Sequence, residues 1–210
     1  MQGLIIFAVL IAVPTAVAIY IFGKPGRLDA RRERIRKRPS PEGLEDVLTR
    51  NVGLYRQLPD DLRSELHGHV NVFLSEKRFL GLGGQEITPE VQLTVAGVAC
   101  LLLLNTKPSY FPGFSSILVY PDTYETSQVD YDGLVETHRR SRRAGESWHR
   151  GPIVLSWRDV LRGAANAGDG YNVVLHEFAH KLDEENSGTN GQPLLRETGH
   201  YKEWAEVLSQ

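Results

Sequence analysis

Cysteine is almost absent from this 210-residue sequence, in which Cys100 is the only one. An intrachain disulfide is therefore excluded, and so is any zinc cluster built from cysteine thiolates. Cys100 lies in the apolar run 98–104, which predicts a small buried core residue rather than a nucleophile. The shortage of cysteine is compatible with a reducing compartment.

Charge is absent from residues 1–23. Within them, residues 4–22 are apolar enough and, at ~1.5 Å per helical residue, long enough to cross a bilayer. A cleaved signal peptide would carry positive charge before the apolar run and a small-residue cleavage site after it, whereas here the positive charge follows, from Lys24 onward. We therefore expect residues 1–23 to form one N-terminal transmembrane helix that anchors the chain in the lipid bilayer through residues 4–22.

A dense basic segment follows, with eight Lys or Arg against Asp29 and Glu33 in residues 24–38. Basic flanks of a transmembrane helix stay on the cytoplasmic side, which predicts a single-pass protein of the bacterial inner membrane whose domain faces the cytoplasm. The segment has no aromatic residues on which bases could stack, so direct nucleic acid binding is not expected. Residues 24–41 are interpreted as a basic juxtamembrane linker.

Residues 42–210 are predicted to form one α+β domain that is mostly helical. Helical periodicity and capping residues indicate three helices before the motif described below, at residues 44–55, 60–77 and 88–104, and a short helix or turn at 157–165. Short runs of β-branched and aromatic residues predict strands at 116–120 and 151–156. The polar, Arg-rich residues 122–150 show no clear period and are expected to form a long surface loop.

A His-Glu-x-x-His motif is formed by His176, Glu177 and His180. Positions four apart lie on one face of a helix, so both imidazoles can bind one ion, and zinc suits this ligand pair. Glu177 would lie beside the site, near enough to act on a zinc-bound water without binding the metal. Asp169 is the expected N-cap of this helix, and the strand at 151–156 is expected to pair with an extended peptide across the zinc.

This pattern predicts hydrolysis of peptide bonds through a zinc-bound water. His176 and His180 are the expected metal ligands, and Glu177 is the expected general base. A helix that carries the same residues for structural reasons and binds no metal is the alternative interpretation.

No residue in the sequence stands at a spacing from the motif that would identify it as the third zinc ligand. The metzincin pattern is excluded because it needs Gly and His at the positions of Asp183 and Asn186. Glu184 would lie ~12 Å along the helix axis from His176, too far to converge on the same ion. Asp183 could orient one imidazole or be a solvated acid at the end of the helix. Further candidates are His200, Glu197, Glu203 and Glu206.

The motif segment, residues 172–183, resembles the Mlc titration factor A family of zinc metallopeptidases. Five further stretches resemble the family in the same order, at residues 73–79, 99–104, 118–122, 145–148 and 154–157. The resemblance covers residues 44–210. It implies a zincin-like metallopeptidase domain of the gluzincin type, similar to the catalytic domain of anthrax lethal factor, with Zn²⁺ held by His176 and His180 and with Glu177 as general base.

The same resemblance implies that the third ligand is a Glu on a downstream helix, preceded by a Tyr. Both would fall beyond Gln210, so the domain at residues 42–210 is expected to be truncated at its C-terminus. The family name also implies an alternative function, a regulatory binding protein that captures a transcriptional repressor, with peptidase activity secondary or absent in this chain. The expected partners are therefore a peptide or protein substrate and a transcriptional repressor.

Overall fold

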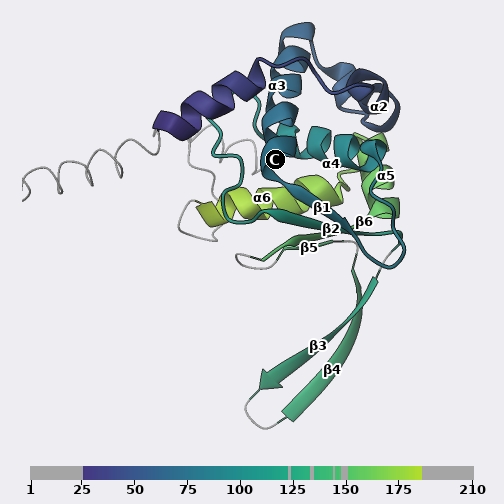
Figure 1. The fold of residues 1–210 in the computed structure, drawn as a ribbon. Coiled ribbons are helices and arrows are strands. Elements are labelled where there is room, and N and C mark those ends of the chain that lie inside the picture. The colour runs from purple at the N-terminus through teal and green to yellow at the C-terminus, as the bar shows by residue number, and fades with distance from the viewer. Residues whose placement is uncertain (1–25, 123, 133–134, 144, 148–150, 186–210) are drawn as a thin grey trace, which may run out of the picture.

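A layer of helices covers one face of a small sheet in the computed structural model (Figure 1), which describes residues 26–122, 124–132, 135–143, 145–147 and 151–185. Residues 26–36 are helical, and they precede α2 (Leu44–Asn51), the short 3₁₀ helix η1 (Tyr55–Gln57), α3 (Asp60–Glu76), α4 (Pro89–Leu101), α5 (Trp157–Ala165) and α6 (Val173–Glu185). The helix expected at 60–77 is confirmed, with α3 ending one residue early, and the short helix or turn expected at 157–165 is the helix α5.

The main sheet has four strands in the order β1, β2, β6, β5. Their bounds are β1 (Arg78–Gly81), β2 (Ser116–Tyr120), β5 (Gly145–Ser147) and β6 (Ile153–Ser156). β1, β2 and β6 run parallel, whereas β5 is antiparallel to β6. All four residues of β6 are buried, as expected of a central strand. A mostly helical α+β fold with a small sheet is therefore confirmed.

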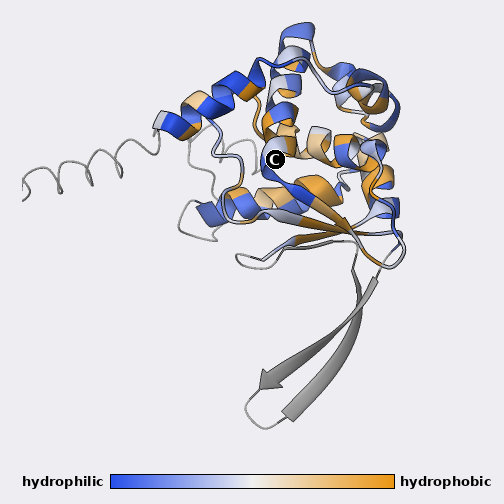
Figure 2. Cartoon of the chain, viewed as in Figure 1, coloured by the Kyte–Doolittle hydropathy of each residue, from blue (hydrophilic) through white to orange (hydrophobic). Residues whose placement is uncertain are grey.

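The core lies between the sheet and the helices, where the hydrophobic residues gather in Figure 2. α4 is apolar around most of its circumference and is the buried central helix, as predicted. It begins as the sequence indicates, because the Thr88 side chain accepts a hydrogen bond from the backbone N–H of Val91 and Pro89 occupies the first turn. Cys100 lies on this helix and is fully buried, which confirms its structural role.

The expectation of a long loop at residues 122–150 is wrong. The structure has a two-stranded antiparallel hairpin there, β3 (Tyr124–Asp132) and β4 (Val135–Arg143), followed by β5. The hairpin projects away from the sheet and packs mainly against itself (Figure 1). The sequence shows no alternation of polar and apolar residues here, which is the pattern by which strands packed on a core are predicted.

The basic segment reaches the body through its helical part, residues 26–36. Arg32 makes a bidentate ion pair with Glu76 at the end of α3, at 2.8 and 2.9 Å, and Ile35 is buried in the core. Among the described residues, none of the helices is both long and apolar enough to span a bilayer. The predicted transmembrane span, residues 4–22, lies outside them.

Candidate metal centre

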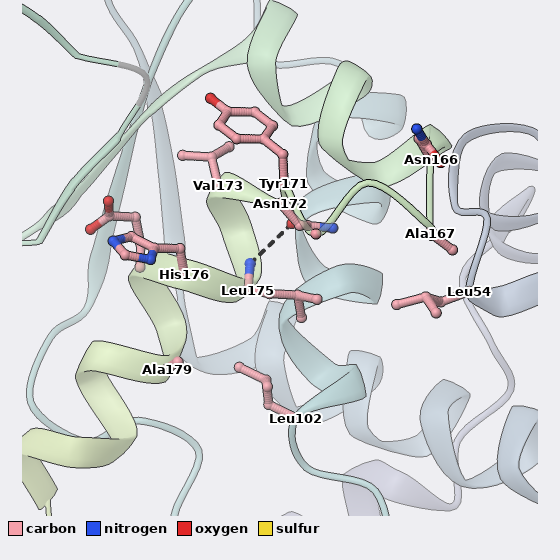
Figure 3. A pocket seen from close by; sticks show the side chains of 12 residues that line it. Leu54, Leu102, Asn166, Ala167, Tyr171, Asn172, Val173, Leu175, His176 and Ala179 are labelled. Carbon is pink, nitrogen blue, oxygen red and sulfur yellow. Dashed lines mark hydrogen bonds between the residues drawn. The ribbon is translucent and has the colours of Figure 1, made fainter. Parts of the chain in front are cut away.

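The motif helix α6 is fixed at its first turn by Asn172. Its side-chain oxygen accepts a hydrogen bond from the backbone N–H of Leu175 at 3.0 Å, drawn as a dashed line in Figure 3, and its amide donates to the carbonyl of Gly163 on α5 at 3.1 Å. Asp169, the expected cap, is three residues too early and instead accepts from the N–H of Tyr171. Asn172 therefore both caps α6 and ties it to α5.

His176 and His180 come together on the exposed face of α6. Their Nε2 atoms are 3.1 Å apart, and the two rings stand at 86° to one another. Two nitrogens bound to one tetrahedral zinc at ~2.0–2.1 Å each would lie ~3.3 Å apart, so these two side chains fit the ion with a small adjustment. Burial, and then the neighbouring His180, lower the pKa of His176, which favours the neutral imidazole that metals bind.

Glu177 is rotated by about 100° from His176 around the helix axis and is buried, with 6% of its surface exposed. The next residue, Phe178, packs its ring against those of Phe111, Phe73 and Phe114, at centroid distances of 4.9, 5.6 and 5.7 Å. This aromatic cluster anchors the buried face of α6, so rotation of the helix about its axis would disrupt the core. The orientation of the two histidines and of Glu177 is therefore set by core packing.

The outer strand β5 contacts α6. The sequence prediction placed a peptide-binding strand at residues 151–156, but β6 is hydrogen-bonded to β2 on one side and to β5 on the other, so no edge is left for a peptide. Within the part of the chain that the structure describes, β5 is the strand whose outer edge lies on the side of the motif helix. The sequence prediction missed β5 because three residues are too few to show a period.

A hollow of about 700 Å³ opens beside the first turn of α6 (Figure 3). Its wall is mostly apolar and comes from several elements, with Leu54 next to η1, Leu102 after α4, and Leu175 and Ala179 on α6. His176 and Glu177 also line it, so the hollow and the motif share one surface. A cavity of this size and character suits a large apolar side chain next to the two imidazoles.

A third metal ligand is not assembled within the described residues, where no group of three or more His, Cys, Asp or Glu side chains gathers. Glu184 forms an ion pair with Lys181 at 3.0 Å, in accord with its exclusion as a ligand. Asp183 is half-buried on α6, and its suggested role in orienting an imidazole stays a prediction. The other candidates, His200, Glu197, Glu203 and Glu206, lie outside the described residues.

Comparison with known proteins gives a family match over most of the chain. The family model described as glucose-regulated metallo-peptidase M90 matches residues 27–210. Uncharacterized protein slr2042 of Synechocystis sp. is 34% identical over 204 residues, which cover 96% of this chain and 74% of that protein. Mlc titration factor A of Yersinia pestis and of Yersinia pseudotuberculosis are each 34% identical over 147 residues, 69% of this chain. The chain spans only 54% of the length of these two relatives.

Proposed function

Because this chain belongs to the glucose-regulated metallo-peptidase M90 family, we propose that it is a zinc-dependent peptidase with Glu177 as its general base. The observation that carries the proposal is the 3.1 Å separation of the His176 and His180 Nε2 atoms, with Glu177 on the same helical turn. Zinc held by these histidines would supply a Lewis acid and bring the pKa of a water toward neutrality. The third protein ligand is proposed to come from the chain after α6.

Glu177 would move the protons of the reaction. Its carboxylate accepts a proton from the attacking water and returns that proton to the leaving amine, which completes hydrolysis of the peptide bond. Because Glu177 is 6% exposed, few solvent molecules can reach it to exchange that proton. The aromatic cluster around Phe178 supports this role by holding the carboxylate and the histidines in a fixed relation.

The proposed substrate is an extended peptide or protein segment. Such a segment can add to the outer edge of β5 through backbone hydrogen bonds, which would lay it alongside α6. The apolar hollow lined by Leu54, Leu102 and Leu175 would then receive one of its side chains. Backbone pairing and side-chain recognition would in this way come from two different parts of the site.

Substitution of Glu177 by Gln tests the proposal. The variant is expected to keep its zinc, because both imidazoles remain, and to lose peptidase activity by ~10²–10⁴-fold, because the amide cannot accept the proton. Zinc content and peptide cleavage are measured on the same preparation. The matched control, Glu86→Gln, changes an exposed glutamate outside the site and is expected to alter neither quantity. Full peptidase activity in the Glu177→Gln variant would contradict the proposal.

Capture of a transcriptional repressor is a second candidate function. It is favoured by the 34% identity to relatives named Mlc titration factor A, a name that suggests interaction with Mlc. Binding of a repressor depends on the surface of the protein and does not require proton transfer by Glu177. Capture of an Mlc-type repressor should therefore persist in Glu177→Gln and His176→Ala, and failure of both variants to retain the repressor would count against it.

We further propose that residues 4–22 anchor this domain in the bacterial inner membrane, with the basic segment on the cytoplasmic side. Support comes from the uncharged apolar run and from the positive charge that begins at Lys24. The helix at residues 26–36, which is tied to the body through Arg32 and Ile35, would then hold the domain close to the membrane surface.

A further inference from the structure

The helix at residues 26–36, purple in Figure 1, carries three of its arginines on one face. At ~100° per residue, Arg27, Arg31 and Arg34 fall within about 60° of one another, and all three residues are exposed. They span ~10 Å along the helix axis, which is about one Debye length at ~0.1 M salt, so their fields add. This arginine face is therefore a compact patch of positive charge.

The acidic residues of the helix lie on its other side. Asp29 and Glu33 are ~130–170° away from the centre of the arginine face. Glu33 forms ion pairs with Lys37 at 3.1 Å and with Arg36 at 3.6 Å, which neutralise its charge locally. Among the residues that the structure describes, no carboxylate forms an ion pair with the arginine face. Its positive charge is therefore available to an anionic partner.

The contacts of the helix with the body fix which way the arginine face points. Arg32 is held by Glu76 at the end of α3, and its guanidinium carbon lies 4.9 Å from the centre of the Tyr110 ring. Ile35, three residues later, is buried in the core. The helix cannot rotate about its axis without breaking these contacts, so the arginine face stays turned to the solvent.

We infer that the arginine face binds the anionic phospholipid headgroups of a membrane surface. The inference rests on the proposed anchor at residues 4–22, because Arg27 follows Phe22 by five residues, which extend ~18 Å at most. Guanidinium groups pair with phosphate oxygens through charge-assisted, often bidentate hydrogen bonds. Leu28, next to Arg27 in the sequence, is 39% exposed and supplies an apolar side chain that can enter the boundary between headgroups and acyl chains.

Nucleic acid offers the same phosphate groups but fits the helix less well. The helix has no aromatic side chain on which a base could stack. Three phosphate contacts alone supply only weak binding without sequence preference. A bilayer presents phosphates together with an apolar layer, which the exposed Leu28 can reach. The membrane surface is therefore the partner that suits both the charge of the helix and its exposed apolar residue.

Lipid contact is measured on the full chain in nanodiscs of phosphatidylcholine, alone or with about 30% phosphatidylglycerol to supply negative charge. A nitroxide label is attached at A30C, because Ala30 is exposed beside the arginine face and the natural Cys100 is fully buried. The measured quantity is the rate at which the label collides with a water-soluble nickel complex. Three arginines should make docking ~10²-fold more favourable on the anionic bilayer, so the collision rate should fall about threefold there and recover at ~1 M salt.

Two sets of variants connect the lipid preference to the arginine face. R27Q/R31Q/R34Q is expected to abolish the difference between the two bilayers, whereas R27K/R31K/R34K should retain most of it because the charge stays. The matched control, R50Q/R78Q/K107Q, removes three exposed cations from other parts of the surface and should leave the difference unchanged. Circular dichroism and thermal unfolding check that each variant is folded.

Three results would overturn the inference. They are equal collision rates on neutral and anionic bilayers, a difference that survives in the three-glutamine variant, and stronger protection of the label by duplex DNA than by anionic lipid.

Extraction with alkaline carbonate separates this inference from the proposed anchor. A chain that resists extraction but shows no lipid preference would refute the inference alone. A chain that carbonate extracts would refute the anchor. Added vesicles of the same two compositions would then replace the nanodiscs, and the arginine face should still give a preference for the anionic ones.

Discussion

At the scale of single residues, Lys77 connects the core to the loop that supports α6. Its ammonium group donates hydrogen bonds to the carbonyl oxygens of Phe111 and Phe114 and lies 4.2 Å from the centre of the Phe114 ring. Both phenylalanines pack on Phe178 of the motif helix. Burial is the main cause that lowers the pKa of Lys77 to about 8. The charge of this lysine therefore affects the stability of the site's support.

The stability of the protein should depend on pH through Lys77. Between about 8, the pKa in the folded state, and 10.5, the pKa of an ordinary lysine, the unfolded chain binds more protons than the folded one. The free energy of unfolding should then rise with pH across this window, and below it, where Lys77 is protonated in both states, Lys77 should cause no change with pH. Urea unfolding of the wild type and of Lys77→Met at pH 8 and pH 10 measures the effect. The wild type should gain stability relative to the variant, and equal pH dependence would contradict the assignment.

The sequence predicts which residues carry the chemistry better than it predicts the contacts that hold those residues in place. The pairing of His176 and His180 can be predicted because helical geometry alone brings positions four apart together. The partners of Lys77 are backbone carbonyls more than thirty residues away, at separations of 34 and 37, and no side-chain pattern encodes such acceptors. The error over Asp169 has the same origin, because either Asp169 or Asn172 can cap a helix and only the path of the chain decides between them.

At the scale of elements, the position of α6 depends on its close approach to α5. A Cβ atom at Gly163 of α5 would lie 2.9 Å from the Cα of Asn172 and 3.0 Å from the carbonyl oxygen of Tyr171. Both are backbone atoms at the start of the motif helix, so they cannot turn aside as a side chain could. Glycine is required here for packing, and the space it leaves lets Asn172 reach the Gly163 carbonyl.

Gly163→Ala is therefore expected to push the first turn of α6 away from α5 and to destabilise the protein by about 1–3 kcal/mol. The free energy of unfolding in urea measures the loss, and zinc affinity reports the accompanying displacement of His176. Gly168→Ala is the matched control, because its Cβ would meet Asn166 at an ordinary distance of 3.7 Å. Equal stability of the two variants would show that α5 and α6 are not tightly packed at this point.

Helices and strands were predictable from the sequence where burial of one face leaves apolar residues at a regular spacing. α3 and α4 have apolar positions at helical spacing or throughout, and the capping residues Thr88 and Pro89 fix where α4 begins. The sequences of β3 and β4 are polar and show no such pattern, so a loop was expected there. The pair Asp132-Gly133 was the signal that could have indicated a hairpin turn between them.

At the scale of the whole molecule, the helix at residues 26–36 and the β3–β4 hairpin relate to the body in different ways. The helix at residues 26–36 is bound to α3 by the Arg32–Glu76 ion pair and places Ile35, 5% exposed, in the core. The hairpin instead projects beyond the sheet and packs mainly against itself (Figure 1). The first segment should therefore contribute to the stability of the fold, whereas the hairpin should contribute little to it.

Removal of the hairpin should then change stability much less than removal of one core side chain. Replacing residues 124–143 with a short Gly-Ser linker between β2 and β5 is expected to change the free energy of unfolding by less than about 1 kcal/mol, since the body loses few contacts. Ile35→Ala, a change of three carbon atoms, is expected to cost about 2–5 kcal/mol because Ile35 lies in the core. Urea unfolding of both variants against the wild type measures the difference. A larger loss from the hairpin deletion than from Ile35→Ala would mean that the ribbon is part of the folding unit.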